Sequence, residues 1–227
     1  TSDNLESLSL AGATMEILAH STLADIFGAE NSAGLTSGST SNVSDRIYIM
    51  QADGTGIFTA YYYRTASRGG SGWRQVGDNS TDYQDLTLPL DTGMLISRIG
   101  DDDLTLYVYG SVKKTESHMR VLETGFSLLG NPFPVDIQLS ESGLYASDNG
   151  YVSQSSSVAS DVLYVISADG NFDSYYYRTA SRGGSGWRQV GDNTTDVGSQ
   201  ILPATSSFYI KHIGTGLTWN PSRPYSL

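Results

Sequence analysis

The residues best suited to bind a ligand lie in a segment that occurs twice, here called the cassette. Residues 61–79 and residues 175–193 share nineteen identical letters, YYYRTASRGGSGWRQVGDN. A cluster of Tyr62, Arg64 and Trp73 in this hairpin would form a cation–π stack, or a flat aromatic platform for a sugar ring. The candidate binding residues are Tyr62, Arg64, Arg68, Trp73 and Arg74 in the first cassette and Tyr176, Arg178, Arg182, Trp187 and Arg188 in the second.

The cassette also has a purely structural interpretation. Its pattern predicts a hairpin with strands over residues 61–65 and 73–76 and a loop over residues 67–72. A period of two places Tyr61 and Tyr63 on one face and Tyr62 and Arg64 on the other. Cross-strand pairs of this kind contribute about 0.2–1 kcal/mol each to a hairpin. The identity of the two loops fits a shared kind of partner surface or a recent gene conversion.

Acidic residues offer a second kind of site. Seven of them lie in turn-like segments, and two pairs occupy matching places after the cassette hairpins. They are Asp78, Asp82, Asp101, Asp102, Asp103, Asp192 and Asp196. Carboxylates are hard oxygen ligands that suit Ca²⁺, although the EF-hand spacing is absent and aspartate also favours turns by itself. Calcium is the one ion for which the sequence offers ligands, and no other cofactor is expected.

Catalytic motifs are missing from the sequence. It contains no Gly-x-Ser-x-Gly, no P-loop and no Gly-x-Gly-x-x-Gly. His20, His118 and His212 are scattered, and the chain has no cysteine, which excludes thiol nucleophiles, thiolate metal sites and disulfides. We expect a protein that is not an enzyme.

The cassettes belong to a longer internal repeat. Residues 45–54 match residues 161–170, with a connector that is two residues shorter in the second copy, and residues 93–98 parallel residues 207–212. The polar residues 113–120 are the expected junction. The sequence therefore predicts a first domain over residues 1–118 and a second over residues 119–227.

The local pattern within each copy has the period of a strand. Strands are predicted over residues 46–50, 58–65, 73–77, 94–99, 104–112, 126–129 and 135–139. One short helix is predicted over residues 21–27, with Ser21 or Thr22 as its cap and Gly28 as its end. Short strands separated by Gly, Asn, Asp and Ser are typical of sandwiches and barrels. We predict an all-β fold of two tandem homologous domains, each sandwich-like or barrel-like.

Composition narrows the classes of partner. The net charge is −11, from 13 basic and 24 acidic side chains, which disfavours nucleic acids as partners. Fifteen Tyr, 6 Phe and 3 Trp supply a core, which excludes a disordered acidic tail. No run approaches the roughly 18 apolar residues of a membrane span, so no membrane insertion is expected. The few lysines among many Ser, Thr, Gly and Tyr indicate an exported chain whose leader has been removed.

The order of these motifs resembles that of a known family. Tyr-Tyr-Tyr-Arg, Trp-Arg-x-Val-Gly, Thr-Asp, Leu-Pro and Gly-x-x-Ile-x-Arg follow one another, and Phe-Ser-Leu-Leu-Gly-Asn-Pro-Phe-Pro-Val occupies residues 126–135. Together they resemble an uncharacterised family of secreted bacterial tandem-repeat β proteins, associated with bacteria that have exosortase-type sorting systems. The resemblance implies an extracellular or cell-surface protein with no known activity.

Two functional hypotheses follow. The first is an extracellular structural or interaction protein that partners itself, as a filament or surface-layer subunit. Unpaired edge strands, or residues 5–11 near the N-terminus, would supply strand addition between copies. The alternative is a bivalent carbohydrate-binding, adhesin-like module that holds one glycan at each cassette.

Overall fold

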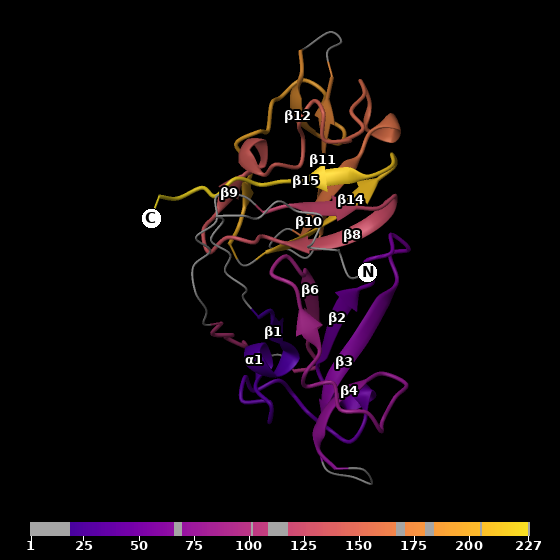
Figure 1. The fold of residues 1–227 in the computed structure, drawn as a ribbon, viewed down its shortest axis with the longest axis vertical. Helices are drawn as coiled ribbons and strands as arrows, with labels where there is room; N and C mark the ends of the chain where they lie inside the picture. The colour runs from indigo at the N-terminus through magenta and orange to yellow at the C-terminus, as the bar shows by residue number, and fades with distance from the viewer. Residues whose placement is uncertain are drawn as a thin grey trace, which may run out of the picture.

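The computed structural model describes residues 19–65, 70–100, 102–108, 118–166, 171–179, 184–204 and 206–226. It shows an all-β fold built from two open antiparallel sheets, which are stacked along the long axis of the molecule (Figure 1). The sheet of the first repeat (residues 19–108) has the order β4 (Gly72–Gln75), β3 (Phe58–Arg64), β2 (Arg46–Met50), β6 (Met94–Ser97). The sheet of the second repeat (residues 118–226) has the order β12 (Gly186–Gln189), β11 (Phe172–Arg178), β10 (Val162–Ile166), β14 (Ser207–His212), β8 (Gly125–Gly130).

Short strand pairs cover one face of each sheet and close its core. They are β1 (Ser21–Thr22) with β5 (Thr87–Leu88), β9 (Ile137–Gln138) with β13 (Ile201–Leu202), and β7 (Arg120–Leu122) with β15 (Leu217–Trp219). In the first repeat Leu23, Phe27 and Ile47 pack together, and in the second Leu163 and Phe208 are among the buried residues. Burial of these apolar side chains is the main force that holds each sheet to its cover.

The predicted helix is confirmed. Helix α1 (Leu23–Phe27) begins after Thr22, whose side-chain oxygen accepts a hydrogen bond from Asp25 N, and it ends at Gly28. The remaining helical turns are 3₁₀: η2 (Ser41–Val43), η3 (Leu139–Glu141) and η4 (Ser157–Ala159). No helix in the described ranges is long and apolar enough to cross a membrane.

Two strand predictions need correction. Residues 104–108 form no strand, and Leu104 and Leu106 instead pack half-buried against the core of the first repeat; residues 109–112 lie outside the described residues. The strand expected over residues 135–139 is reduced to β9, because Leu139 already begins η3. In both segments, apolar residues that do not pair with another strand produced the strand-like pattern in the sequence.

Each repeat places one buried aspartate at the same point. Asp161 is fully buried, and its carboxylate accepts hydrogen bonds from the backbone N–H groups of Val152 (2.9 Å) and Ile213 (2.8 Å), while His212 Nδ1 lies 2.8 Å away. Its counterpart Asp45 accepts from Thr36 N and Ile99 N at 2.8 Å each, and Arg98 Nε lies 2.7 Å from it. Asp45 thus links the start of β2 to the chain that follows β6. In the same way, Asp161 links the start of β10 to the chain that follows β14.

Candidate functional site

The cassette forms the predicted hairpin. Neither face of this hairpin is the exposed binding platform that the sequence predicted. Tyr62 pairs with Arg74 and Tyr63 with Trp73 across strands β3 and β4. Trp73 therefore shares the face of Tyr61 and Tyr63, and the prediction that groups it with Tyr62 and Arg64 is wrong. Its ring is fully buried against Tyr63 and Phe27, and its Nε1 donates to the Gly28 carbonyl at 2.9 Å.

The second face of the hairpin is buried as well. Residues 76–82 fold back over Tyr62, Arg64 and Arg74, which are 2 %, 8 % and 4 % exposed. Tyr62 donates its hydroxyl proton to Asn79 Oδ1 at 2.7 Å, Arg64 donates to the Asn79 carbonyl at 3.1 Å, and Arg74 lies 3.3 Å from Asp82. These side chains serve the fold of the hairpin and its covering loop.

The second cassette repeats this arrangement. Tyr176 donates its hydroxyl proton to Asn193 Oδ1, Arg178 donates to the Asn193 carbonyl at 2.8 Å, and Arg188 pairs with Asp196 at 3.0 Å. Trp187 packs edge-on against Tyr177 and Tyr151 and is 4 % exposed. An aromatic platform for a sugar would need exposed rings, so the platform proposed for Trp73 and Trp187 is not formed.

Burial on both faces gives a physical reason for much of the identity between the cassettes. Gly72 and Gly186 have φ angles of +147° and +149°, a backbone conformation that residues with a side chain rarely adopt, so the hairpin requires glycine at both positions. The tip residues 66–69 and 180–183, which include Arg68 and Arg182, lie outside the described residues. Packing therefore accounts for the identity of the cassette residues that the structure describes.

Two of the candidate calcium ligands, Asp78 and Asp192, accept hydrogen bonds from other residues of their own turns. Asp78 Oδ1 accepts from Ser80 N, Ser80 Oγ and Thr81 N, and Asp192 Oδ1 accepts from Thr194 N, Thr194 Oγ1 and Thr195 N. These hydrogen bonds hold the pKa of both carboxyl groups well below the usual range.

The other candidate acids do not join these turns in a cluster. Asp82 and Asp196 lie beside Arg74 and Arg188, Asp102 and Asp103 lie on the chain before the half-buried Leu104, and Asp101 is outside the described residues. Among the described residues, no three His, Asp or Glu side chains gather as metal ligands would.

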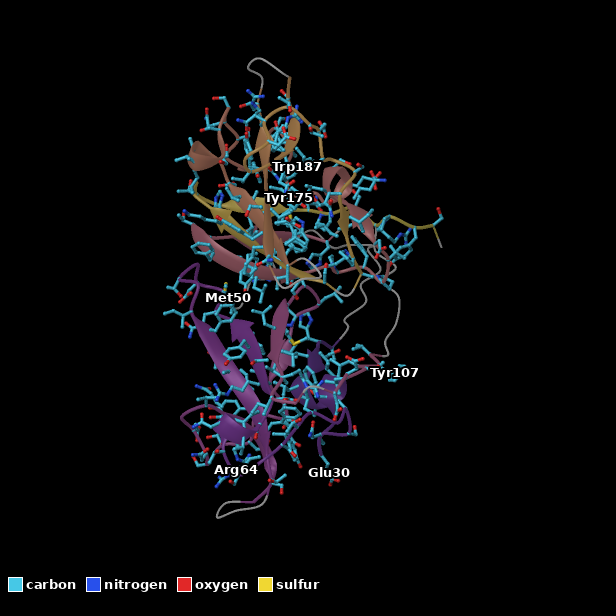
Figure 2. The ribbon with its side chains drawn as sticks, turned by 180° about the vertical axis from the view of Figure 1, so that it is seen from behind. Glu30, Met50, Arg64, Tyr107, Tyr175 and Trp187 are labelled. Carbon is cyan, nitrogen blue, oxygen red and sulfur yellow. The ribbon has the colours of Figure 1, made fainter. Side chains whose placement is uncertain are left out.

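The two cassettes lie at opposite ends of the molecule. In Figure 1, β4 is near one end and β12 near the other, and in Figure 2 Arg64 and Trp187 lie at opposite ends with Met50 between them. An elongated body thus carries the same hairpin at each end.

The two repeats meet at the edge strand β8. One side of β8 pairs with β14 over six residues. On its other side, loops of the first repeat cap the backbone: Phe126 N donates to the Gly54 carbonyl, and Gly130 N donates to the Asp91 carbonyl, each at 2.9 Å. Gly93 approaches so closely that a Cβ there would lie within 2.6 Å of the Leu128 side chain. Loops of the first repeat therefore satisfy part of the outer backbone of β8.

Aromatic side chains line a groove of about 510 Å³ beside this junction. Phe58 of the first repeat packs edge-on against Tyr209 of the second, which also contacts Phe172. The groove is further lined by Met50, Thr55, Gly56, Phe126 and Tyr164. Phe172 is 53 % exposed, so an aromatic ring of this groove reaches the surface.

Sequence reasoning missed this junction, although a signal was present. The first repeat has a connector two residues longer than the second, and those extra residues fall next to Thr55 and Gly56, which contact β8 and the groove. The longer connector of the first repeat therefore marked the segment that contacts β8.

Asp91 anchors the first repeat to the start of the second. It is 3 % exposed, and its Oδ2 lies 3.2 Å from His118 Nε2 and 3.1 Å from the Arg120 guanidinium. Burial acts to raise the pKa of Asp91, but the neighbouring His118 and Arg120 outweigh it and hold the pKa below its ordinary value.

We expect Asp91→Asn to destabilise this junction by about 1–3 kcal/mol near neutral pH, the worth of contacts between charged groups that are partly buried. Because the pKa is lowered in the folded protein, the contribution is present above the ordinary aspartate pKa of about 4 and is lost as pH falls through the folded value. Urea unfolding at pH 7 and at pH 3 should show a smaller difference between wild type and variant at pH 3. An equal difference at both pH values would contradict the assignment.

Comparisons with protein-family models, with curated proteins and with solved structures found no match to this chain. The class is therefore defined by the structure: an all-β protein of two sequence-related repeats that share one edge strand at their junction.

Proposed function

We propose that this protein is an extracellular structural protein that joins other copies of itself through the cassettes at its two ends. The observation that supports this is their position, since identical hairpins lie at opposite ends of one body (Figure 1). If only one end of the molecule makes a self-complementary contact, two molecules form a closed dimer. The same contact on both ends propagates into a filament.

Charge at the cassettes is consistent with such a contact. Each tip carries an arginine, Arg68 or Arg182, on a chain whose net charge is −11. Each hairpin also exposes an acidic side chain, because the side chains of Asp82 and Asp196 are 42 % and 57 % exposed. In a contact where the arginine of one copy meets the aspartate of the other, each molecule supplies one charge of each sign.

Composition and resemblance support a place outside the cell. The chain is poor in lysine and rich in Ser, Thr, Gly and Tyr, and its motif order resembles that of secreted bacterial repeat proteins. The buried catalytic-type groups that the structure does describe, such as His212 and Asp161, are engaged in holding the repeat together. The proposal is accordingly a non-catalytic role.

Charge reversal at the tips tests the proposal. Light scattering of the wild type should show masses that rise with concentration well above 24.4 kDa, and micrographs should show linear assemblies. Arg68→Glu and Arg182→Glu should each stop growth at dimers, and the double variant should remain monomeric, with end contacts weakened by at least about tenfold. Lys211→Glu makes the same charge change away from the tips and should assemble like the wild type. A monomeric wild type, or a double variant that still assembles, would refute end-to-end joining.

A further inference from the structure

The two faces of the second repeat's sheet differ in what covers them. Leu163 on β10 and Phe208 on β14 belong to the core that the short strand pairs close. Side chains alternate along a strand, so the neighbouring residues Tyr164 and Tyr209, which oppose each other across β10 and β14, point to the opposite face. Both are half-buried, and both line the aromatic groove beside the junction. This part of the sheet therefore presents aromatic rings toward the surface.

The rings of this groove stand at steep angles to one another. The Tyr209 ring makes an angle of 79° with that of Phe58 and 67° with that of Phe172. A flat platform for a sugar needs ring faces in one plane, whereas rings set edge to face form the walls of a site for an apolar group. Met50, which lies between the two ends of the molecule in Figure 2, adds a flexible apolar side chain to the lining. The groove is therefore lined for an apolar group.

A second groove, of about 360 Å³, lies next to the aromatic one on the same face of the sheet. The two grooves share Tyr164 as a lining residue. The lining of the second groove is richer in polar side chains, which are Ser157, Ser160, Ser174 and Lys211. An elongated ligand that crosses Tyr164 would thus meet apolar rings on one side and polar groups on the other.

Lys211 supplies a positive charge beside both grooves. It follows Tyr209 by two residues on β14 and shares its face, and its Nζ lies 5.9 Å from the centre of the Phe126 ring, which lines the aromatic groove. In the part of the chain that the structure describes, Lys211 forms no ion pair, and no acidic side chain lines either groove. A lysine without a carboxylate partner beside apolar rings is complementary to an anion with an apolar body.

We propose that these grooves bind a long-chain carboxylate, with its hydrocarbon chain among the aromatic rings and its carboxylate at Lys211. The aromatic groove of about 510 Å³ lies within the roughly 300–1,000 Å³ that is typical of small-molecule sites. Its lining includes Phe58 of the first repeat and Phe172 of the second, so the ligand contacts both repeats. The proposal does not depend on assembly through the cassettes.

Isothermal titration calorimetry with laurate, below its micellar concentration, tests the proposal. Laurate should bind the wild type. Octanoate, which has four methylenes fewer, should bind at least about tenfold more weakly, because each methylene removed from water strengthens binding about fourfold. Dodecyltrimethylammonium has a chain of similar length and a positive head, and it should also bind at least about tenfold more weakly, although the net charge of the protein is −11.

Two variants locate the ligand. Phe172 is 53 % exposed, so Phe172→Ala should leave the fold intact and weaken laurate binding at least about tenfold. Its control is Tyr107→Ala, which removes a ring that is 71 % exposed and lies apart from Met50 in Figure 2, and which should bind like the wild type. Lys211→Gln should weaken laurate binding about fivefold, whereas Lys211→Arg keeps the charge and should stay within about twofold of the wild type.

Laurate binding that weakens in both Phe172→Ala and Lys211→Gln would support the site. A wild type that does not bind laurate, or binding that neither variant weakens, would overturn it. Binding of maltohexaose in place of laurate, lost in Phe172→Ala, would make the rings a sugar site. Self-association lost in Phe172→Ala, without laurate binding, would make a second copy the occupant. Either result also overturns the proposal. The titrations can be read on a monomer, so failure of end-to-end joining leaves this test intact.

Discussion

Replacing Trp187 with alanine is expected to lower the free energy of unfolding by about 3–5 kcal/mol, the cost of removing a large aromatic side chain from a packed core. The indole is 4 % exposed and packs edge-on against Tyr177 and Tyr151. The loss combines the transfer energy of the ring with the cavity that it leaves. Urea unfolding followed by tyrosine fluorescence and circular dichroism measures it.

The matched control for this variant is Phe172→Ala. Phe172 lies at the start of β11, one strand from Trp187, but it is 53 % exposed. Its replacement should change the free energy of unfolding by no more than about 0.5 kcal/mol. If Trp187→Ala left stability unchanged and removed binding to a glycan, the ring would have to be a surface platform, in conflict with its burial.

Replacing Asp161 with alanine should also cost about 3–5 kcal/mol, because the change leaves the buried partners of a carboxylate without an acceptor. Asp161 is fully buried and holds two backbone N–H groups and His212. The substitution should lower the thermal midpoint of the second repeat before that of the first. Differential scanning calorimetry would record the separation as a second, earlier transition.

Two further variants sharpen this prediction. Asp148→Ala removes an exposed carboxylate in the same repeat and should have an effect within about 0.5 kcal/mol. Asp45→Ala removes the equivalent acceptor from the first repeat, where Arg98 is the charged partner, and should shift the transition of that repeat instead. A loss of stability spread equally over both transitions in either variant would show that the carboxylates act globally rather than within their own repeats.

Local signals predicted the elements well where one face is buried. Thr22 and Gly28 bound α1 because a hydroxyl cap and a glycine end are set by the backbone of the helix itself. The alternation of Tyr61, Tyr62 and Tyr63 also placed their side chains on the correct faces of β3. The register of β3 and β4 was not predictable from the alternation alone, and an error of one residue moves Trp73 to the opposite face.

The use of the second face could not be predicted from periodicity. Tyr62 and Arg64 have the polar tips expected of a solvent-facing row, yet residues 76–82 cover them with carbonyl and carboxamide acceptors. The hydrogen bonds that the Gly54 and Asp91 carbonyls accept from β8 were also not predictable from residue type, because backbone carbonyls are the same for every residue.

The dual role of β8 has a consequence for any attempt to divide the protein. By its ladder the strand belongs to the second repeat, but its outer backbone is shielded by residues near Gly54 and Asp91 of the first. A fragment that starts near residue 118 would keep the strand and lose the shield. Its exposed N–H and C=O groups would then be free to pair with strands of other molecules and cause aggregation. The first repeat therefore protects the second from aggregation.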